Sequence, residues 1–310
     1  MMMAAVVDSV CFIALLLVLP PLMLGVIRKT KARLQNRIGA PVWQPALDLL
    51  KLFRKEETIS ETASWVFRFS AAAGLSMVLY LAFITPWIKP QPHFASCDLF
   101  LLLYMFAAMR LVALLAAMDT ASPFGAFAAS REATLSFLVE PAAILSLAAL
   151  GTVAQTSDLS IVFSQLAGKH SALWIVSGTA LFLAGLVELS RMPIDDPTTH
   201  LELTMVHEAM ILEASGSNLA LIEYATAIKL SVLLGLSAQC YLCAIPNTAL
   251  WNSPTLAAAS ILGLALMAVI VGIFESLAVK LNWRKAPEFI AYALTLSFMA
   301  SLIAVGADLL

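Results

Sequence analysis

Residues 219–245 read LALIEYATAIKLSVLLGLSAQCYLCAI and contain only two charged side chains, Glu223 and Lys229. A bilayer core of roughly 30 Å is crossed by about 20 mostly apolar residues in a helix, so this stretch is long enough to span a membrane. Other stretches of the chain have the same character. The predicted spans are eight, at residues 5–27, 64–88, 99–118, 134–154, 172–190, 219–245, 255–279 and 288–308.

The composition is typical of an integral membrane protein. Hydrophobic residues make up 61% of the 310 residues, charged residues 12%, and the mean hydropathy is +0.91. A soluble domain is about half apolar and about a quarter charged. The short alternating segments of a membrane barrel are absent from the sequence. We therefore expect an all-α, polytopic membrane protein that forms a single membrane domain over residues 1–310, without a soluble appendage.

Lysine and arginine predict the orientation in the membrane, because they are enriched in cytoplasmic loops. One side of the predicted topology holds Arg28, Lys29, Lys31, Arg33, Arg37, Lys51, Arg54, Lys55, Arg131, Arg191, Lys280, Arg284 and Lys285. The other side holds only Lys89 and Lys169. The segments 28–63 and 191–218 are thus predicted to be cytoplasmic, with both termini outside. No basic residue precedes the first apolar stretch, which we interpret as a retained helix and not a signal peptide.

Segment 28–63 contains a predicted amphipathic helix. Trp43, Leu47, Leu50 and Phe53 would share one side of it. Such a helix lies in the plane of the lipid headgroups or under a docked partner. The alternative is an ordinary basic loop that only fixes the topology.

Segment 191–218 has the signals of a second helix. Asp195-Asp196-Pro197 is a good helix start, and Ser215-Gly216 a good end. On that helix, Glu202 and Glu213 would lie within about 20° of each other. His207-Glu208 resembles half of a zinc motif, but the second histidine is missing, so no metal is expected.

Several charged residues fall inside the predicted spans. Glu140, Glu188, Glu223 and Glu275 lie in four different spans, about one turn from the cytoplasmic end, and Lys229 and Arg110 lie deeper. Glu140 and Glu223 are expected in first turns, where the helix dipole favours a carboxylate. Glu188 and Glu275 are expected near helix C-termini, where a lysine, an arginine or a proton must compensate the carboxylate. Arg191 is three residues from Glu188, and Lys280 is five residues from Glu275.

Ionisable residues inside a membrane are functional-site candidates by default. Two interpretations of these residues remain open. The side chains either reach the headgroups and satisfy helix ends, or they form a path for protons or ions, which needs carboxylates beside movable cations.

The cysteines offer little redox chemistry. Cys240 and Cys243 form a CxxC inside an apolar helix, which favours small core residues over an outer disulfide. The sequence has no P-loop, dinucleotide fingerprint or cluster-binding cysteine motif. If the chain serves a redox reaction, we expect other subunits to carry the electrons.

Several motifs, in the right order, resemble the complex I subunit 1 family. Residues 188–195, ELSRMPID, resemble its E-x-x-R-x-P-F-D motif, and residues 213–216, EASG, its E-Y-S-G. Glu223-Tyr224 resembles the following E-Y, and residues 33–39, RLQNRIG, the segment after the first helix. Residues 119–124, 129–132 and 139–141 are more similar to the branch that holds the membrane subunits of formate hydrogenlyase and related group 4 [NiFe] hydrogenases.

The resemblance implies a membrane anchor and ion-coupling subunit. It implies an iron–sulfur small subunit and a hydrogenase-like large subunit docked on the cytoplasmic side, and antiporter-like membrane subunits beside the chain. Nickel-iron and iron–sulfur centres would lie in those partners, with none bound by this chain. The implied coupling residues are Glu140, Glu188, Glu202, Glu213 and Glu223, and the implied loop-fixing residues are Arg37, Arg131, Arg191 and Asp195.

The sequence departs from the family in the segments that form a quinone chamber in complex I. Thr198 and His200 replace two carboxylates of the usual acidic run, and residues 39–42 read GAPV. Both changes weaken the case for quinone binding and leave docking intact. The alternatives are a quinone-reactive complex I subunit, an anchor that moves no ion, and a stand-alone transporter, for which a matched pair of broken helices is missing.

Overall fold

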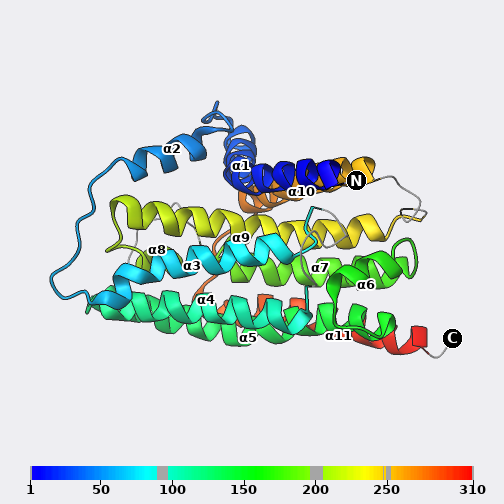
Figure 1. The fold of residues 1–310 in the computed structure, drawn as a ribbon. Helices are drawn as coiled ribbons and strands as arrows, with labels where there is room; N and C mark the ends of the chain where they lie inside the picture. Colours follow the sequence, from blue (N-terminus) through cyan, green and yellow to red (C-terminus); the bar gives the residue numbers. More distant parts are fainter. Residues whose placement is uncertain (1, 89–96, 196–204, 247, 249–252, 309–310) are drawn as a thin grey trace.

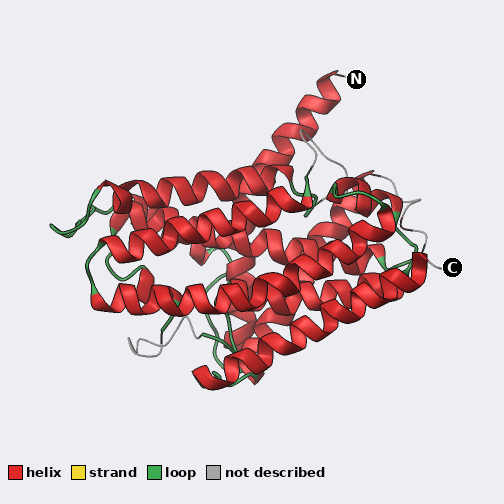
Figure 2. Ribbon diagram, turned by 90° about the horizontal axis from the view of Figure 1, so that it is seen from below, coloured by secondary structure: helices red, strands yellow, loops and turns green. Residues whose placement is uncertain are grey.

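The computed structural model describes residues 2–88, 97–195, 205–246, 248 and 253–308. Helices make up almost all of the regular structure in these ranges (Figure 2), apart from an isolated bridge between Asp98 and Asp158. The all-α prediction is confirmed.

Eight helices are long and apolar enough to cross a membrane. They are α1 (Met2–Leu34), α3 (Trp65–Ile84), α4 (Leu99–Asp119), α5 (Pro123–Ala154), α7 (Ser171–Glu188), α9 (Gly216–Cys243), α10 (Ser253–Leu277) and α11 (Ala286–Asp308). Short elements complete the fold: α2 (Gln44–Phe53), α6 (Leu159–Gln165), α8 (His207–Met210) and the 3₁₀ turn η2 (Trp283–Lys285). Each predicted span corresponds to one of these eight helices.

Helix α9 runs through the middle of the bundle (Figure 1). It packs against α1, α3, α7 and α10, while α5, α7 and α11 pack together on the other side. Buried residues occur on every side of α9, among them Ile228, Leu230, Val232 and Leu234. A helix that is apolar all round is stable only when it is surrounded by protein or lipid. A charged residue on α9, such as Lys229, is therefore held well inside the bundle.

Two helix boundaries differ clearly from the prediction. Helix α1 continues to Leu34 instead of residue 27, and α5 begins at Pro123 instead of residue 134. The predicted spans stop where polar and charged residues interrupt the apolar stretch, whereas the helices continue through these residues. Pro123 occupies the first turn of α5, where a missing N–H costs nothing and the fixed φ suits a helix. As a result Glu140 lies in the middle of α5, and its predicted place in a first turn is wrong.

The amphipathic helix in segment 28–63 is present as α2. Pro45 is buried, and α2 contacts α1 and α9. Trp43, Leu47, Leu50 and Phe53 are all exposed. These four side chains therefore face away from the bundle, as expected for a helix that meets lipid headgroups or another protein.

The long helix predicted in segment 191–218 is wrong where the structure describes the segment. Only α8 is helical between residues 205 and 215, and residues 196–204, with Glu202, lie outside the described residues. The carboxylate of Asp195 accepts hydrogen bonds from Lys280 and from the Val206 N–H. Ser215 and Gly216 begin α9 instead of ending a helix.

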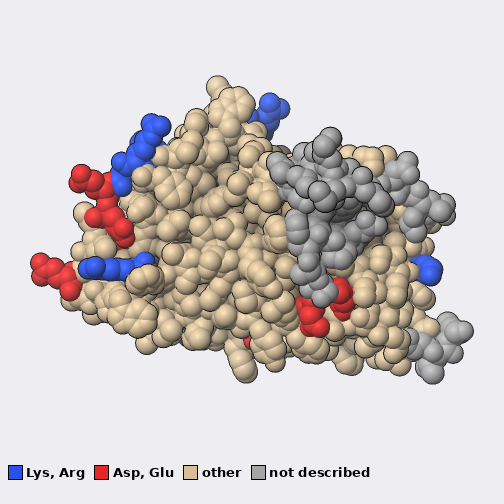
Figure 3. Space-filling model, in the orientation of Figure 1, with Lys and Arg blue, Asp and Glu red and all other residues tan. Residues whose placement is uncertain are grey.

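Charges are sparse on the side of the bundle. In Figure 3 the middle of the visible face is almost free of charged side chains, which gather toward the two ends. The N- and C-terminal helices finish at the same end of the bundle, opposite the connection between α2 and α3 (Figure 1). This arrangement agrees with eight crossings of a membrane.

Candidate functional site

Four charged side chains from four helices meet inside the bundle. The guanidinium of Arg110, on α4, donates to Glu140 on α5 and to Oε2 of Glu188 on α7, the latter at 2.5 Å. Nζ of Lys229, on α9, lies 2.7 Å from Oε1 of Glu188. We call Arg110, Glu140, Glu188 and Lys229 the central cluster.

The central cluster is held in surroundings where single charges are unfavourable. The side chains of Arg110 and Glu188 are each 10% exposed and that of Lys229 is 15% exposed, whereas that of Glu140 is 40% exposed. A charge inside a membrane protein is tolerated when an opposite charge or a hydrogen bond compensates it. Glu188 has two cationic partners, so its charge balance depends on the positions of both Arg110 and Lys229.

Glu188 is the last residue of α7, as the sequence indicated. The dipole of α7 disfavours a negative charge there, and the last carbonyl groups of a helix lack intrahelical partners. Lys229 compensates the charge of the Glu188 carboxylate, and it also donates a hydrogen bond of 3.1 Å to the carbonyl oxygen of Glu188. The prediction that a cation compensates Glu188 is confirmed, but the expected cation, Arg191, is wrong.

A second group of charges lies around segment 191–195. Glu275, with a side chain only 2% exposed, lies 3.2 Å from Nη1 of Arg191 and 3.7 Å from Nζ of Lys31. Asp195 lies 2.8 Å from Nζ of Lys280, which the sequence had placed beside Glu275. The chain turns at Ser190, where φ is +47°, and this turn directs Arg191 away from Glu188. We call Lys31, Arg191, Asp195, Glu275 and Lys280 the loop cluster.

The remaining predicted residues lie apart from the central cluster. Arg131 donates to the carbonyl of Met205 at 3.4 Å and stacks over the Phe127 ring. Glu223 lies six residues before Lys229 on α9, and Glu213 is exposed in the turn before α9. Arg37 is exposed just after α1. Of the predicted coupling carboxylates, Glu140 and Glu188 lie in the central cluster and Glu275 lies in the loop cluster.

The buried Glu132 and the half-buried His207 were not predicted as site residues. Glu132 on α5 is 6% exposed, and its Oε2 accepts a hydrogen bond of 3.0 Å from Ser190. His207 begins α8, and burial together with the nearby positive charge of Lys229 lowers its pKa to about 4. The predicted span began at residue 134, so Glu132 counted as part of a loop. His207 was considered only as half of a metal motif.

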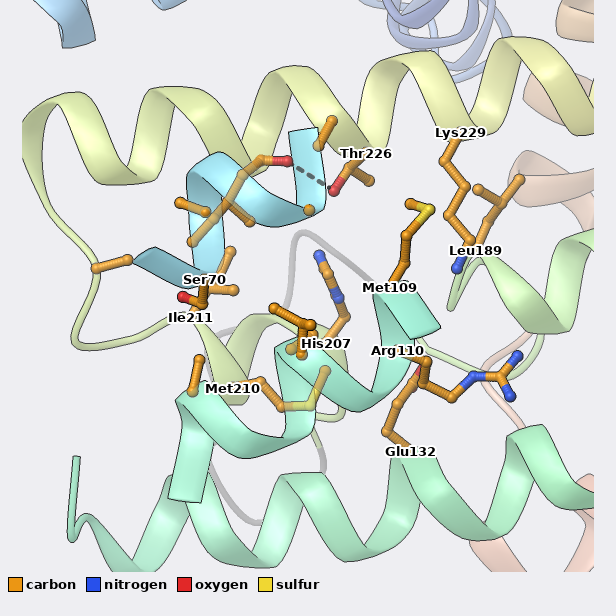
Figure 4. A pocket seen from close by; sticks show the side chains of 18 of the residues that line it. Ser70, Met109, Arg110, Glu132, Leu189, His207, Met210, Ile211, Thr226 and Lys229 are labelled. Atoms are coloured by element: carbon orange, nitrogen blue, oxygen red, sulfur yellow. Dashed lines mark hydrogen bonds between the residues drawn. The ribbon is translucent and has the colours of Figure 1, made fainter. Parts of the chain in front are cut away.

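Cavities lie on both sides of the Arg110–Glu188 pair. The first, of about 120 Å³, is lined by these two residues and by Glu132, His207 and Lys229. Figure 4 shows Arg110, Glu132 and Lys229 at one end of it, Ser70 and Met210 at the other, and His207 between them.

The second cavity, of about 150 Å³, is lined by Arg110, Glu140 and Glu188, with apolar side chains such as Leu102 and Leu236. Each cavity has room for several water molecules, since one water needs roughly 10–15 Å³ of such volume. The ion pair thus separates two spaces that water can fill. Among the described residues, no group of three metal-ligating side chains is present.

Fold and site together define a multi-pass helical membrane protein with an ion-pair network between two cavities. The chain belongs to the NADH dehydrogenase family, which it matches over residues 7–305. This confirms the resemblance to the complex I subunit 1 family.

Relatives include components of hydrogenase and respiratory complexes. The chain is 34% identical to hydrogenase-4 component C of Escherichia coli (strain K12), over 74% of this chain and 72% of the relative. It is 31% identical to formate hydrogenlyase subunit 4 of the same organism, over 69% and 70% of the two chains. It is 32% identical to a subunit of the NADH-quinone oxidoreductase of Rubrobacter xylanophilus (strain DSM 9941 / JCM 11954 / NBRC 16129 / PRD-1), over 69% and 68%.

The fold is also that of a chain in a solved structure. A chain of the membrane-bound sulfane sulfur reductase, an archaeal respiratory membrane complex, superposes with a TM-score of 0.79, covering 97% of this chain and 99% of that one. The two sequences are 18% identical, so this likeness concerns the fold alone.

Proposed function

We propose that this chain is the membrane anchor and ion-coupling subunit of a multisubunit redox complex resembling a group 4 [NiFe] hydrogenase. The observation that carries the proposal is the central cluster, in which Arg110 joins Glu140 and Glu188 between two cavities. The two Escherichia coli relatives, a component of hydrogenase-4 and a subunit of formate hydrogenlyase, favour the hydrogenase type of complex.

The cluster can couple a movement to a proton or Na⁺ transfer through simple electrostatics. While Lys229 and Arg110 both contact Glu188, its negative charge is compensated and it has little tendency to bind another cation. If either cation moves away, the carboxylate must take up a proton or Na⁺ to stay in its apolar surroundings. Restoring the contact expels that ion. A shift of α4, α7 or α9 by an ångström or two is enough to lengthen these contacts.

In this proposal, such a shift originates at the loop cluster. Arg191, Asp195 and their partners tie the segment after α7 to α1 and α10. Glu188 lies only three residues before Arg191, so a displacement of this segment acts directly on the end of α7. In our proposal, an iron–sulfur small subunit and a hydrogenase-like large subunit dock over segments 28–63 and 191–218 on the cytoplasmic side. Both termini then lie outside, and antiporter-like membrane subunits lie beside the bundle.

The experiment is the Glu188→Gln substitution in the complete complex. The amide keeps the shape of the side chain but removes its charge, so ion translocation driven by the redox reaction should fall at least about tenfold, the effect of 1.4 kcal/mol. Translocation is measured with a pH- or Na⁺-sensitive dye in sealed vesicles, and assembly by co-purification in mild detergent. Glu288→Gln, in the exposed first turn of α11, is the matched control.

The outcomes separate the alternatives. Unchanged translocation in Glu188→Gln would support an anchor that moves no ion. Repeated recovery of the chain without nickel or iron–sulfur subunits would contradict the hydrogenase-type complex. In the proposed arrangement those partners hold all metal centres, and this chain binds none.

A quinone-reactive subunit is the second candidate, because one relative belongs to an NADH-quinone oxidoreductase. The apolar end of the first cavity, with Phe67 and Ile222, suits a quinone ring chemically. However, its volume of about 120 Å³ is below the roughly 300–1,000 Å³ usual for small-molecule sites. Photolabelling of segment 191–218 by a quinone analogue would favour this candidate over the first.

A further inference from the structure

The first cavity contains two titratable groups that the proposed function does not use, Glu132 and His207. They come from different elements, α5 and α8, yet they line the same space as Glu188 and Lys229. A role for these two groups rests on the proposed function, and it concerns where the central cluster obtains its protons.

Glu132 differs from the other carboxylates of the site in its partners. Glu140 and Glu188 each form an ion pair with Arg110, whereas the structure shows no ion pair of Glu132 within the residues that it describes. Its hydrogen bond comes from a neutral group, the hydroxyl of Ser190, at 3.0 Å. A carboxylate that is 6% exposed and has no cation bound to it has one simple means of losing its charge, which is to bind a proton.

The position of Glu132 connects it to Glu188. Ser190, its hydrogen-bond donor, lies two residues after Glu188 in the turn that ends α7. Lys229 contacts Glu188 and also acts electrostatically on Glu132. Glu132 and Glu140 are eight residues apart on α5, which is about 12 Å along the helix axis. Glu132 therefore does not occupy the position from which Glu140 pairs with Arg110. It approaches Glu188 from the first cavity, and Glu140 approaches it from the second.

His207 lies where residues 207–214 line the first cavity. Its ring points into the cavity, between the apolar end and the charged end (Figure 4). The backbone next to it is fixed, since the N–H of Val206 donates to Asp195 at 2.8 Å and Asp195 in turn accepts from Lys280. Lys229 from α9 and Asp195 and Arg191 from the preceding segment act electrostatically on His207, and Glu132 from α5 lines the same cavity.

A neutral imidazole is suited to passing protons. One ring nitrogen accepts a proton while the other gives one up, so the ring carries a charge only briefly. Burial and the charge of Lys229 keep the His207 ring neutral at rest, which leaves one nitrogen available as an acceptor. Water in the cavity can connect the ring to the Glu132 carboxylate, because the space holds several molecules.

We propose that His207 and Glu132 form the proton-loading pair of the central cluster. A proton from water at the end of the bundle that carries segment 191–218 binds one nitrogen of His207. The opposite nitrogen releases a proton, which the Glu132 carboxylate accepts. When Lys229 or Arg110 moves away from Glu188, Glu132 gives this proton to Glu188 through cavity water and becomes a carboxylate again.

The test uses Glu132→Gln and His207→Gln in the complete complex, reconstituted in sealed vesicles with a pH-sensitive dye. We expect proton translocation to fall at least tenfold in both variants. Raising the proton concentration should restore part of the rate in His207→Gln but not in Glu132→Gln, so the pH profile of the former moves to lower pH. The matched control is His170→Gln, an exposed histidine at the start of α7, at the opposite end of the helix from Glu188.

A second readout does not depend on the redox reaction. A protonated buried carboxyl gives an infrared C=O band, and this band should be missing from the acid-minus-base difference spectrum of Glu132→Gln. If Glu132→Gln fails to assemble, Glu132→Asp keeps a carboxyl but shortens the side chain by one methylene, so the infrared band should remain while translocation falls. If His207→Gln fails to assemble, His207→Asn also removes the ring that passes protons.

The failure of this inference and that of the proposed function can be told apart. Normal translocation with a normal pH profile in Glu132→Gln and His207→Gln, together with loss in Glu188→Gln, would overturn the loading pair and leave the coupling role in place. Normal translocation in all three would overturn both.

Discussion

At the scale of single residues, Arg110 and Lys229 explain how four charges remain inside the bundle. Arg110 uses the two ends of its planar guanidinium to bind carboxylates on two different helices, α5 and α7. A lysine has one ammonium group and is less suited to this bridging geometry. Lys229 instead binds the carboxylate and the carbonyl of the same residue, Glu188. The two cations therefore have different tasks, and they should respond differently to substitution.

Replacing Arg110 with alanine should destabilise the chain by about 3–5 kcal/mol, because a buried carboxylate loses its bridging partner. Arg110→Lys should recover only part of this loss. The free energy of unfolding in detergent, followed by circular dichroism, gives the measurement. Arg68→Ala, at an exposed position on α3, should change it little. Equal effects of the Arg68 and Arg110 substitutions would mean that the central cluster adds nothing to stability.

The stability of the chain should also depend on pH through His207. Its pKa is lowered from 6.5 to about 4 in the folded chain, so the unfolded chain binds more protons between these two values. The contribution of His207 is therefore fully present above about pH 6.5 and is lost as the pH falls toward 4. We expect the melting temperature of the wild type to fall faster than that of His207→Gln over this range. Parallel curves for the two proteins would contradict the prediction.

At the scale of elements, the start of α9 contacts segment 28–63. The Ser215 hydroxyl accepts from the N–H of Thr58 at 2.9 Å and donates to the Thr58 carbonyl at 2.7 Å. Gly216 has a φ of +53°, and a Cβ placed there would lie 2.6 Å from the carbonyl oxygen of Glu56. Only glycine fits this approach without moving the backbone of residues 56–58.

Gly216→Ala should release the segment around residues 56–58 from α9. We expect faster cleavage by a protease that is added to the purified complex, within residues 54–64, and a loss of stability. The control is Gly74→Ala on α3, where an added Cβ meets nothing within 4 Å and helix propensity should rise slightly. Unchanged proteolysis in Gly216→Ala would show that the segment is held by other contacts.

The sequence predicted elements better than contacts. Hydropathy was sufficient for the eight spans because each helix must be apolar over the thickness of the bilayer, a property local to its own residues. The ion pairs, in contrast, depend on how the helices pack against one another. Arg110 and Glu188, for example, are 78 residues apart in the sequence. Proximity in sequence therefore suggested Arg191 for Glu188 and Lys280 for Glu275, both wrongly. Glu132 was missed because α5 begins earlier than its apolar residues indicate.

At the scale of the whole molecule, the orientation follows from the proposal that segments 28–63 and 191–218 are cytoplasmic. A cysteine introduced at Lys55 should react with a membrane-impermeant maleimide only when the cytoplasmic side is accessible. A cysteine at Lys169 should react only from the other side. The native Cys97, Cys240 and Cys243 are buried and should give little background, and Cys11 is replaced by serine in both variants. Labelling of Lys55→Cys in intact cells would show that the orientation is the opposite of the proposed one.

One member of the central cluster is not shielded by this chain. The Glu140 carboxylate, midway along a membrane-spanning helix, remains 40% exposed although Arg110 pairs with it. Hydrocarbon tails solvate such a group poorly, so the chain is less stable in the bilayer when it is not bound to another subunit. Newly made copies should therefore persist only once a neighbour covers this side of α5, and cells that lack the neighbour should degrade them.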